Sequence, residues 1–600
     1  MSNGTINVGE DGVGILATGS SDNRTITAST VDLRGGTINV GNNQAVGVFI
    51  ADDATNPLKT TVKNTGTNMT VGTNAFGYVV DSKTGTDLLL GTATNKLTAS
   101  LGPDSVYAYS NDKNGYVYSN TDITTTGGKS YGLYTAGKTE NYGNIDLTGG
   151  NGNVGIYSTG TGYTTNTGTI TMTGEKVKGI VAGDSTTAGT AVINNEGNIT
   201  VTGKEAVAVI AQKGGTVNMP SSSTSTATPV ISVTGRSGLG LYSTSNGKIN
   251  ATNTTVNASG GAINVYKNGG NINLTNATLN TNADSLAFMT GGTTGKIDFS
   301  NTKVTTANIN SKGTAFYYDG ATTAGPTGYA DFSKSNIQTW ASGNFDNLNK
   351  LKLNMAASDS RMFIASQVKM NLADTNLTPA NVASLFGSNS PQITGVTDYK
   401  TFLLYKSLLT IANTDTVNLD NHTEPYNLLE ISNSSITNNG KITGTKAGQY
   451  AMAQTDDTNN ASGTEWVKLI NNGTISLSGS GSTGIYAQAG EITNNGTVTV
   501  GDSSAGIYAV ENTKVDNQKD ITVGSKSTGI FYTDIFKDPV TGVVTTYTTT
   551  TPLKNIGKIT LSGNDSVGMT YETDNIGSGA AMENTGTIIA NGDRSIALYA

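Results

Sequence analysis

Short runs in which apolar and polar residues alternate recur along the chain at a nearly constant interval. The run Ile475–Leu477 (I-S-L) returns about 23 residues later as Val498–Val500 (V-T-V). The run Gly484–Ala487 (G-I-Y-A) returns as Gly506–Ala509 and, in altered form, as Gly529–Tyr532 (G-I-F-Y). Alternation with a period of two is typical of strands with one buried face, and nothing in these repeats has helical spacing. A fixed period in this range indicates one supersecondary unit stacked on copies of itself.

Each repeat contains three β-prone runs separated by Gly and Asn, for example Ile475–Leu477, Ile485–Ala487 and Glu491–Thr493. Three short strands joined by turns make one coil of a parallel β-helix, whose coils lie about 4.8 Å apart. We therefore predict an all-β fold, a right-handed parallel β-helix (solenoid) with three short strands per coil. Inward residues such as Ile475 should stack on their equivalents in the next coil. Paired asparagines should stack as amide ladders, at Asn438-Asn439, Asn471-Asn472 and Asn494-Asn495.

The regular repeat occupies both ends of the chain. Residues 1–319 are predicted to form a parallel β-helix with loop insertions, of which 220–229 is the clearest. Residues 431–600 are predicted to form a regular parallel β-helix with an insertion at 534–553. One interpretation of that insertion is a hairpin arm, because a Pro-Val-Thr-Gly turn lies inside it.

Between residues 320 and 430 the pattern breaks. The segment Thr378–Gly387 combines an N-cap candidate, Pro379 at the first helical position and a glycine at its end, which together indicate a short helix. We predict an irregular continuation of the β-helix with a small helical excursion near 374–412. A separate small domain is the alternative interpretation of this region.

The composition suits a solenoid with a thin core. Among 600 residues there are 76 Gly, while 13% are charged and 35% are hydrophobic. A compact globular domain has about 25% charged residues. The net charge of −8 disfavours a nucleic-acid partner, which requires clustered Lys and Arg. The absence of Cys excludes disulfides and thiolate chemistry. No window of about 18 apolar residues indicates a membrane span.

Candidate catalytic residues are few. Asp52-Asp53 and Asp456-Asp457 are the adjacent Asp pairs, and His422 is the single His of the chain. Polysaccharide lyases and glycosidases need clustered carboxylates, whereas these pairs lie in Thr- and Asn-rich loops, where solvated turn residues are more common. The zinc-protease motif H-E-x-x-H is absent, since the chain has one His. We predict no catalytic residue, no metal site and no cofactor.

With N-N-G-T-I at 471–475 and G-I-Y-A at 484–487 placed, the chain resembles the passenger region of large type V autotransporter adhesins. The repeat sequences are similar to those of the giant fusobacterial outer-membrane adhesins. The resemblance lies in the recurring pattern of residues and extends over essentially all 600 residues. It implies a signal peptide upstream, display on the bacterial cell surface (outer membrane), and membrane contact only through a missing C-terminal β-barrel. The chain begins and ends inside repeat strands, so we expect it to be a piece of a longer protein.

Aromatic residues recur one position after the Ile, Val or Leu of the second strand. If Ile485 and Ala487 point inward, a period of two places Tyr486 outward. From this column we select Tyr157, Tyr242, Tyr486 and Tyr508 as candidate ligand-binding residues, and from the excursion Phe386, Phe402 and Tyr405. The alternative is that the column only packs between coils. Loops, which carry most binding sites, are the other places to look.

These observations predict a non-enzymatic cell-surface adhesin segment that attaches to host cells or other bacteria through loops on a rigid β-helix. The partner would be a surface protein or glycan, and many weak contacts would add as avidity. Two alternatives stay open. One is a β-helical carbohydrate-active enzyme, such as a polysaccharide lyase or glycosidase, and the other is a pure structural stalk.

Overall fold

The computed structural model describes residues 1–19, 29–52, 58–220, 225–299, 302–321, 328–371, 382–397, 399–421, 430–432, 434–454, 467–537 and 542–600. Its contacts form two compact units, which we describe separately. The N-terminal unit comprises 1–317, 338–361 and 383–399, and the C-terminal unit comprises 318–337, 362–382 and 400–600. Our division of the sequence at 319 and 430 concerns the repeat pattern and stays a prediction.

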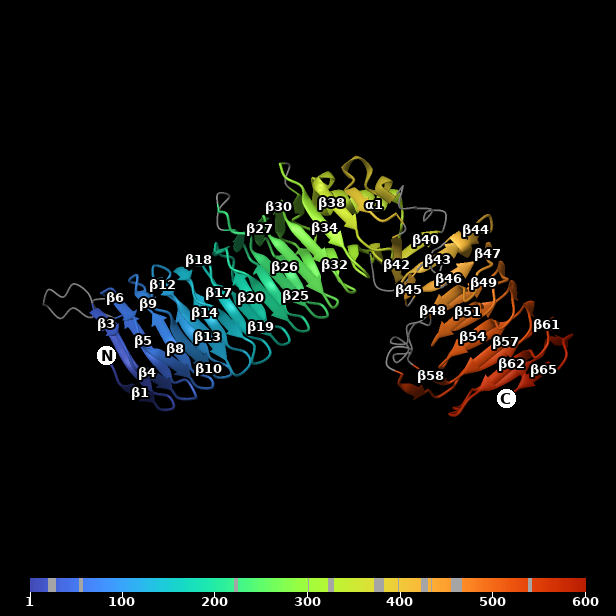
Figure 1. Ribbon diagram of the computed structural model, residues 1–600, viewed down its shortest axis with the longest axis horizontal. Helices are drawn as coiled ribbons and strands as arrows, with labels where there is room; N and C mark the ends of the chain where they lie inside the picture. Colours follow the sequence, from blue (N-terminus) through green and yellow to red (C-terminus); the bar gives the residue numbers. More distant parts are fainter. Residues whose placement is uncertain are drawn as a thin grey trace. The chain divides into compact units, whose positions relative to one another are not determined.

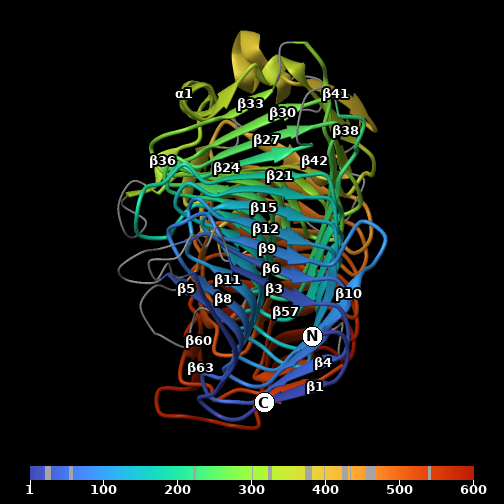
Figure 2. The same cartoon turned by 90° about the vertical axis from the view of Figure 1, so that its left-hand side faces the viewer.

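The N-terminal unit is a parallel β-helix with three strands per coil, as predicted. Each strand of the regular repeat pairs with the strand three places later in the chain, so the strands form three sheets (Figure 1). The first is a 14-stranded sheet from β1 (Thr5–Val8) to β41 (Gln392–Gly395). The second runs in this unit from β2 (Val13–Gly19) to β35 (Thr314–Asp319). The third has 12 strands, from β3 (Ser29–Leu33) to β37 (Phe345–Asp346), several of which are stacked in Figure 2.

The C-terminal unit repeats this organisation. A nine-stranded sheet runs from β36 (Ala330–Asp331) to β63 (Ala581–Asn584), and a seven-stranded sheet from β44 (Thr416–Asn418) to β64 (Thr587–Ala590). A six-stranded sheet runs from β48 (Tyr450–Gln454) to β65 (Ile596–Tyr599).

The core consists of side chains that point inward from every strand and stack on the equivalent residue of the next coil. Ile475 lies opposite Val498, and Ile485 lies opposite Ile507. All four are at most 1% exposed. Their alternation with polar neighbours confirms the predicted period of two and sets the outward direction of the residues between them.

Buried asparagines form the predicted amide ladder at one corner of the C-terminal unit. The Nδ2 of Asn438 donates to Oδ1 of Asn471, which donates to Asn494, and each N···O distance is 2.7 Å. The ladder continues through Asn517, Asn555 and Asn584. Each hydrogen bond joins the donor of one coil to the acceptor of the next, so the buried amides of this ladder are paired. Asn584, at the end of the ladder, is exposed.

A second, exposed ladder runs beside the buried one. Asn495 donates to Asn472, which donates to Asn439, each at 2.9 Å. The following glycines are stacked so closely that a Cβ on Gly496 would overlap the carbonyl oxygen of Gly473. Glycine is therefore required at this point of the coil.

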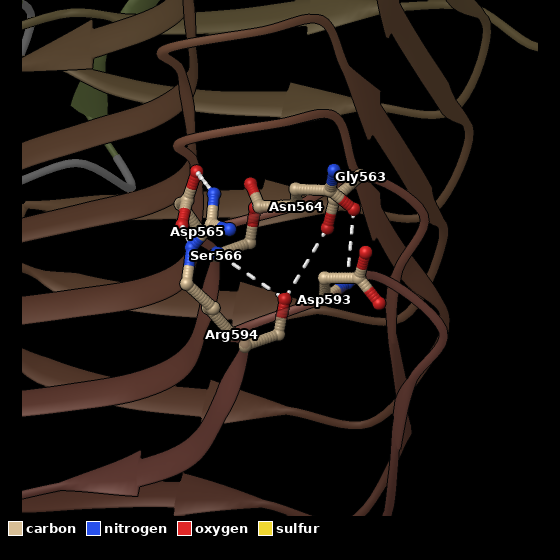
Figure 3. Close-up of polar contacts among 7 residues, drawn as sticks. Gly563, Asn564, Asp565, Ser566, Asp593 and Arg594 are labelled. Atoms are coloured by element: carbon tan, nitrogen blue, oxygen red, sulfur yellow. Dashed lines mark hydrogen bonds and ion pairs between the residues drawn. The ribbon is translucent and has the colours of Figure 1, made fainter.

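The turn that leads into the second strand of a coil contacts the equivalent turn of the next coil (Figure 3). Asn564 Oδ1 accepts a hydrogen bond from the backbone N–H of Asp593 at 2.9 Å. Ser595 Oγ donates to the Gly563 carbonyl at 3.3 Å. Asp565 and Arg594, which both have left-handed φ (57° and 54°), form a two-point ion pair at 2.6 and 2.8 Å. Equivalent turns of successive coils are thus locked to each other.

Where the repeat breaks, the structure differs in part from our expectation. Within 374–412, the described helical residues are the 3₁₀ segment Val382–Asn389, followed by strands β41, β42 (Lys400–Tyr405) and β43 (Leu408–Ile411). The residues 372–381, which hold much of the helix signal, lie outside the described part of the chain. The α-helix of this region, α1 (Lys334–Asn344), lies where we predicted no helix.

The insertion at 534–553 contains an antiparallel hairpin, as one interpretation of its sequence predicted. Strand β58 (Ile535–Lys537) pairs with β59 (Val544–Thr546), and the turn residues 538–541 lie outside the described part. Of the loop 220–229, residues 221–224 are likewise not described.

Candidate functional site

The predicted aromatic column of the N-terminal unit does point outward. Tyr109, Tyr134 and Tyr157 occupy equivalent positions of β11 (Val106–Ser110), β14 (Tyr131–Thr135) and β17 (Val154–Ser158). Their ring centroids are 5.0 and 4.9 Å apart, with interplanar angles of 28° and 2°. Further along the same sheet the column resumes, where Tyr242 stacks on Tyr266 at 5.2 Å.

These rings stack face to face on the rings of neighbouring coils. Offset stacking at about 5 Å is a favourable arrangement of aromatic pairs, and it leaves mainly ring edges and hydroxyl groups toward solvent. Burial, and then the neighbouring Tyr157 phenol, raise the pKa of Tyr134 to about 12. Tyr157 and Tyr242 also pack against an apolar cluster of Val154, Val181, Val207 and Ile210. This geometry fits the interpretation that the column packs between coils.

The equivalent column of the C-terminal unit is less regular. Tyr486 contacts Tyr508 at 5.6 Å with a 44° tilt, and Tyr508 contacts Phe531 at 4.9 Å. Ile485 and Ala487 on either side of Tyr486 are fully buried, so Tyr486 points outward as predicted. Burial is the main reason that the pKa of Tyr486 lies well above its usual value.

Two candidates from the excursion prove to be core residues. Phe386 is 4% exposed and lies 5.4 Å from Phe316, measured between ring centroids. Phe402 is 2% exposed and lies between Phe332 and Phe363, at 5.0 and 5.8 Å. Neither ring is available to a ligand, because each fills the interior where the repeat is interrupted. Tyr405 is half-buried, with the Lys406 ammonium 5.3 Å from its ring centre.

A second tyrosine-rich surface, which we did not predict, lies on the third sheet of the N-terminal unit. Strands β12 (Tyr116–Ser119), β15 (Lys138–Asn141) and β18 (Tyr163–Asn166) are neighbours there. Their outward residues and the adjacent turn form what we call the tyrosine–glutamate patch: Tyr116, Tyr118, Lys138, Glu140, Tyr142 and Tyr163. Register places Lys138 between Tyr116 and Tyr163.

The Glu140 carboxylate is the centre of the patch. It accepts hydrogen bonds from the hydroxyls of Tyr116 and Tyr142 at 2.9 and 3.2 Å, and pairs with the Lys138 ammonium at 2.8 Å. The Lys138 hydrogen bond, chiefly, holds the pKa of Glu140 below its usual value. Lys138 also lies 4.8 Å from the centre of the Tyr116 ring, within the range of a cation–π contact.

The patch is exposed as well as ordered. Tyr142 is 43% exposed and Tyr163 is 49% exposed. Tyr142 packs against Tyr118 with ring centroids 5.2 Å apart. In the described part of the chain, Tyr163 has no ring–ring contact, so its ring faces are not used in the way that those of the column are.

The sequence signal for this patch is a shared position in the coil, not a shared residue type. Tyr116, Lys138 and Tyr163 each open the third strand of consecutive coils, as their register shows. The second strand carries an aromatic residue at the same position in many coils, and such a recurrence stands out in the sequence. Because the third-strand residues differ from coil to coil, only the register brings them together.

Of the carboxylates considered for catalysis, the structure describes Asp52, which has structural partners. Asp52 accepts hydrogen bonds from Ser82 Oγ and the Lys83 N–H, each at 2.7 Å. Asp53, the pair Asp456-Asp457 and His422 lie outside the described residues. Within the described ranges, no group of three or more His, Asp or Glu side chains could hold a metal ion. Across those same ranges, no helix has the length and apolarity needed to span a bilayer.

No family model matches this chain. No curated protein sequence matches it either. The surfaces described above are therefore interpreted from their own geometry.

Proposed function

We propose that this chain is a non-enzymatic adhesin segment of the autotransporter passenger type, displayed on a bacterial cell surface. The observation that carries the proposal is the tyrosine–glutamate patch. It presents two tyrosines, each more than two-fifths exposed, in or directly after strands that are paired on both sides. Tyrosine supplies large amphipathic contact area at low conformational cost, as it does in antibody paratopes.

The fold supports this function mechanically. Parallel strands held in register, together with the asparagine ladders, fix the positions of surface side chains within each unit. Binding then requires little ordering of the protein, so less of the interaction energy is lost. Partners of this kind are surface proteins or glycans of host cells or of other bacteria, and repeated weak contacts add as avidity.

The carbohydrate-active enzyme is less well supported. Catalysis of glycoside cleavage needs two carboxyl groups positioned across a sugar. The fully buried Asp112 instead accepts backbone N–H bonds from Gly85, Thr86 and Asn114, at 2.8 to 2.9 Å. The Asp52 carboxylate likewise accepts hydrogen bonds from Ser82 and Lys83 of the next coil. These carboxylates stabilise turns between neighbouring coils.

A bead assay tests the proposal. Beads coated with residues 1–600 are incubated with cultured epithelial cells and with a panel of bacterial cells, and attached beads are counted against albumin-coated beads. We expect attachment to at least one cell type, and a large loss with the double variant Tyr142→Ala/Tyr163→Ala. Failure of the wild-type beads on every cell type favours the stalk. Release of new reducing ends from purified polysaccharides favours the enzyme.

A further inference from the structure

We propose that the tyrosine–glutamate patch is a subsite for an uncharged pyranose, with the sugar ring stacked on Tyr163 and its hydroxyls bound by Lys138 and Glu140. This inference rests on the proposed adhesive function and adds to it the class of ligand and the residues that bind it. Three features of the patch lead to it: an exposed ring that stacks on no other ring, unused hydrogen-bonding capacity, and paired charges.

The lack of an aromatic stacking partner for Tyr163, in the described part of the chain, distinguishes this patch from the second-strand column. In the column, the face of Tyr134 is covered by Tyr157, whose ring is parallel to it within 2°. Tyr163 is nearly half exposed, and its strand neighbours are Lys138 on one side and Val192 on the other. The axial C–H groups of a pyranose carry partial positive charge and stack on the negative face of an aromatic ring.

The polar groups beside Tyr163 retain hydrogen-bonding capacity. A carboxylate offers about four acceptor positions, of which Glu140 uses three for Tyr116, Tyr142 and Lys138. An ammonium has three donors, and one of those on Lys138 goes to Glu140. The pair therefore presents an acceptor and donors side by side, which suits two vicinal hydroxyls. The side chain of Lys138 is 55% exposed, so it is accessible to them.

The charge of this surface favours an uncharged sugar over a sialylated or sulfated one. Lys138 is neutralised by Glu140 at 2.8 Å, and in the preceding coils of the same sheet Lys59 is neutralised by Asp87 at 2.8 Å. Asp87 lies directly beside Tyr116 in the sheet. Recognition of an anionic sugar draws on cations that are free to pair with it, typically Arg in a two-point contact. Lys59 and Lys138 are each already paired with a carboxylate, so neither is free to pair with such a ligand.

The test uses the purified 600-residue chain and an array that carries neutral, sialylated and sulfated glycans. Bound neutral glycans are followed by titration with the matching methyl pyranoside in saturation-transfer NMR. We expect binding to neutral glycans, weakened about tenfold by Tyr163→Ala, which corresponds to about 1.4 kcal/mol of binding free energy. We expect Glu140→Gln to weaken it to a similar extent. Tyr163→Phe keeps the ring face and should stay within about threefold of the wild type.

Tyr599→Ala is the matched control, because Tyr599 is 52% exposed and belongs to another sheet. Circular dichroism melts of all variants show whether each one folds. Several outcomes overturn the sugar site: no neutral glycan binds, only acidic glycans bind, or binding is unchanged in Tyr163→Ala. If cell attachment persists in those cases, the adhesive function stands without this site. If Tyr163→Ala abolishes attachment that periodate oxidation of the cell-surface glycans leaves intact, the partner is a protein and the sugar assignment is wrong.

Discussion

The ammonium of Lys267 donates a hydrogen bond to the side-chain oxygen of Asn344 at 2.9 Å, which ties the second-strand sheet of the N-terminal unit to the last residue of α1. The Lys267 side chain is buried and also donates to the Gly292 carbonyl at 3.3 Å. Asn344 in turn donates to the Trp340 carbonyl at 2.8 Å. A cation at the C-terminal end of a helix also interacts favourably with the helix dipole.

Replacing this lysine should loosen the end of the helix. Lys267→Ala removes the partner of Asn344 Oδ1 and leaves a cavity, so we expect a loss of about 2–3 kcal/mol. Lys267→Met keeps most of the volume and should cost less. Hydrogen exchange of residues 338–346 measures the effect locally. Unchanged exchange in Lys267→Ala would show that the contact does not hold the helix.

The buried asparagine ladder predicts a sharp difference between two neighbouring residues. Asn494→Ala leaves the Asn471 amide without its acceptor and the Asn517 carbonyl oxygen without its donor, in a fully buried row. We expect a loss of about 2–4 kcal/mol in denaturant unfolding. Asn495→Ala removes a rung of the exposed ladder and should stay within about 0.5 kcal/mol. Equal effects would contradict the burial-based explanation.

The stability of the C-terminal unit at low pH should depend on the ionisation of Asp420. Its carboxylate accepts hydrogen bonds from the N–H and hydroxyl of Thr445, at 2.8 and 2.7 Å, and from Gln449 Nε2 at 2.9 Å. The backbone bond from Thr445 is the largest of the causes that lower the pKa of Asp420 well below its usual 3.8. A lowered pKa contributes stability above pH 3.8, and that stability is lost as the pH falls through the folded-state pKa.

Asp420→Asn should therefore lower the melting temperature at pH 7. The gap between variant and wild type should narrow as the pH falls below about 3.8. Thermal melts from pH 2 to pH 7 measure this, with Asp593→Asn as a control, because Asp593 is an exposed turn residue of the same unit. A gap that is constant across this range would show that ionisation of Asp420 does not stabilise the fold.

The tyrosine column predicts a loss of stability in alkali. The pKa of Tyr134 is raised from 10.0 to about 12, mainly by burial. A raised pKa means that the folded state holds the proton more tightly, so stability is full below pH 10 and falls as the pH rises to 12. Tyr134→Phe removes one such phenol. Denaturant unfolding between about pH 8 and pH 12, with the phenolate absorbance as a second signal, should show a shallower decline for the variant. A parallel decline would argue against burial of this hydroxyl.

The repeat made much of this fold predictable. Period-two alternation places Ile485 and Ala487 inside and Tyr486 outside, and the structure agrees because strands with equal spacing must stack in register. The asparagine ladder follows from the same spacing. Helix α1 was missed because its apolar residues Ile337, Trp340 and Ala341 are too few to stand out from a polar segment.

The candidate site was harder to predict, for two physical reasons. Phe386 and Phe402 lie where the repeat is interrupted, and both rings fill the interior there, so they are core residues. The tyrosine–glutamate patch combines different residues from consecutive coils. A search for recurring residue types misses a site of that kind, because its residues share a position in the coil but differ in type.

The asparagine ladder also bears on how such a chain can change in length. Removing residues 472–494 would delete one whole coil, since that segment contains β50 (Thr474–Leu477), β51 (Thr483–Gln488) and β52 (Glu491–Asn494). The new junction would read Asn471-Asn495-Gly496-Thr497, in place of the original Asn-Asn-Gly-Thr. Asn471 would then meet Asn517, which already pairs with an asparagine. Unequal recombination between repeats can therefore shorten or extend the protein by whole coils and leave every remaining amide with a partner.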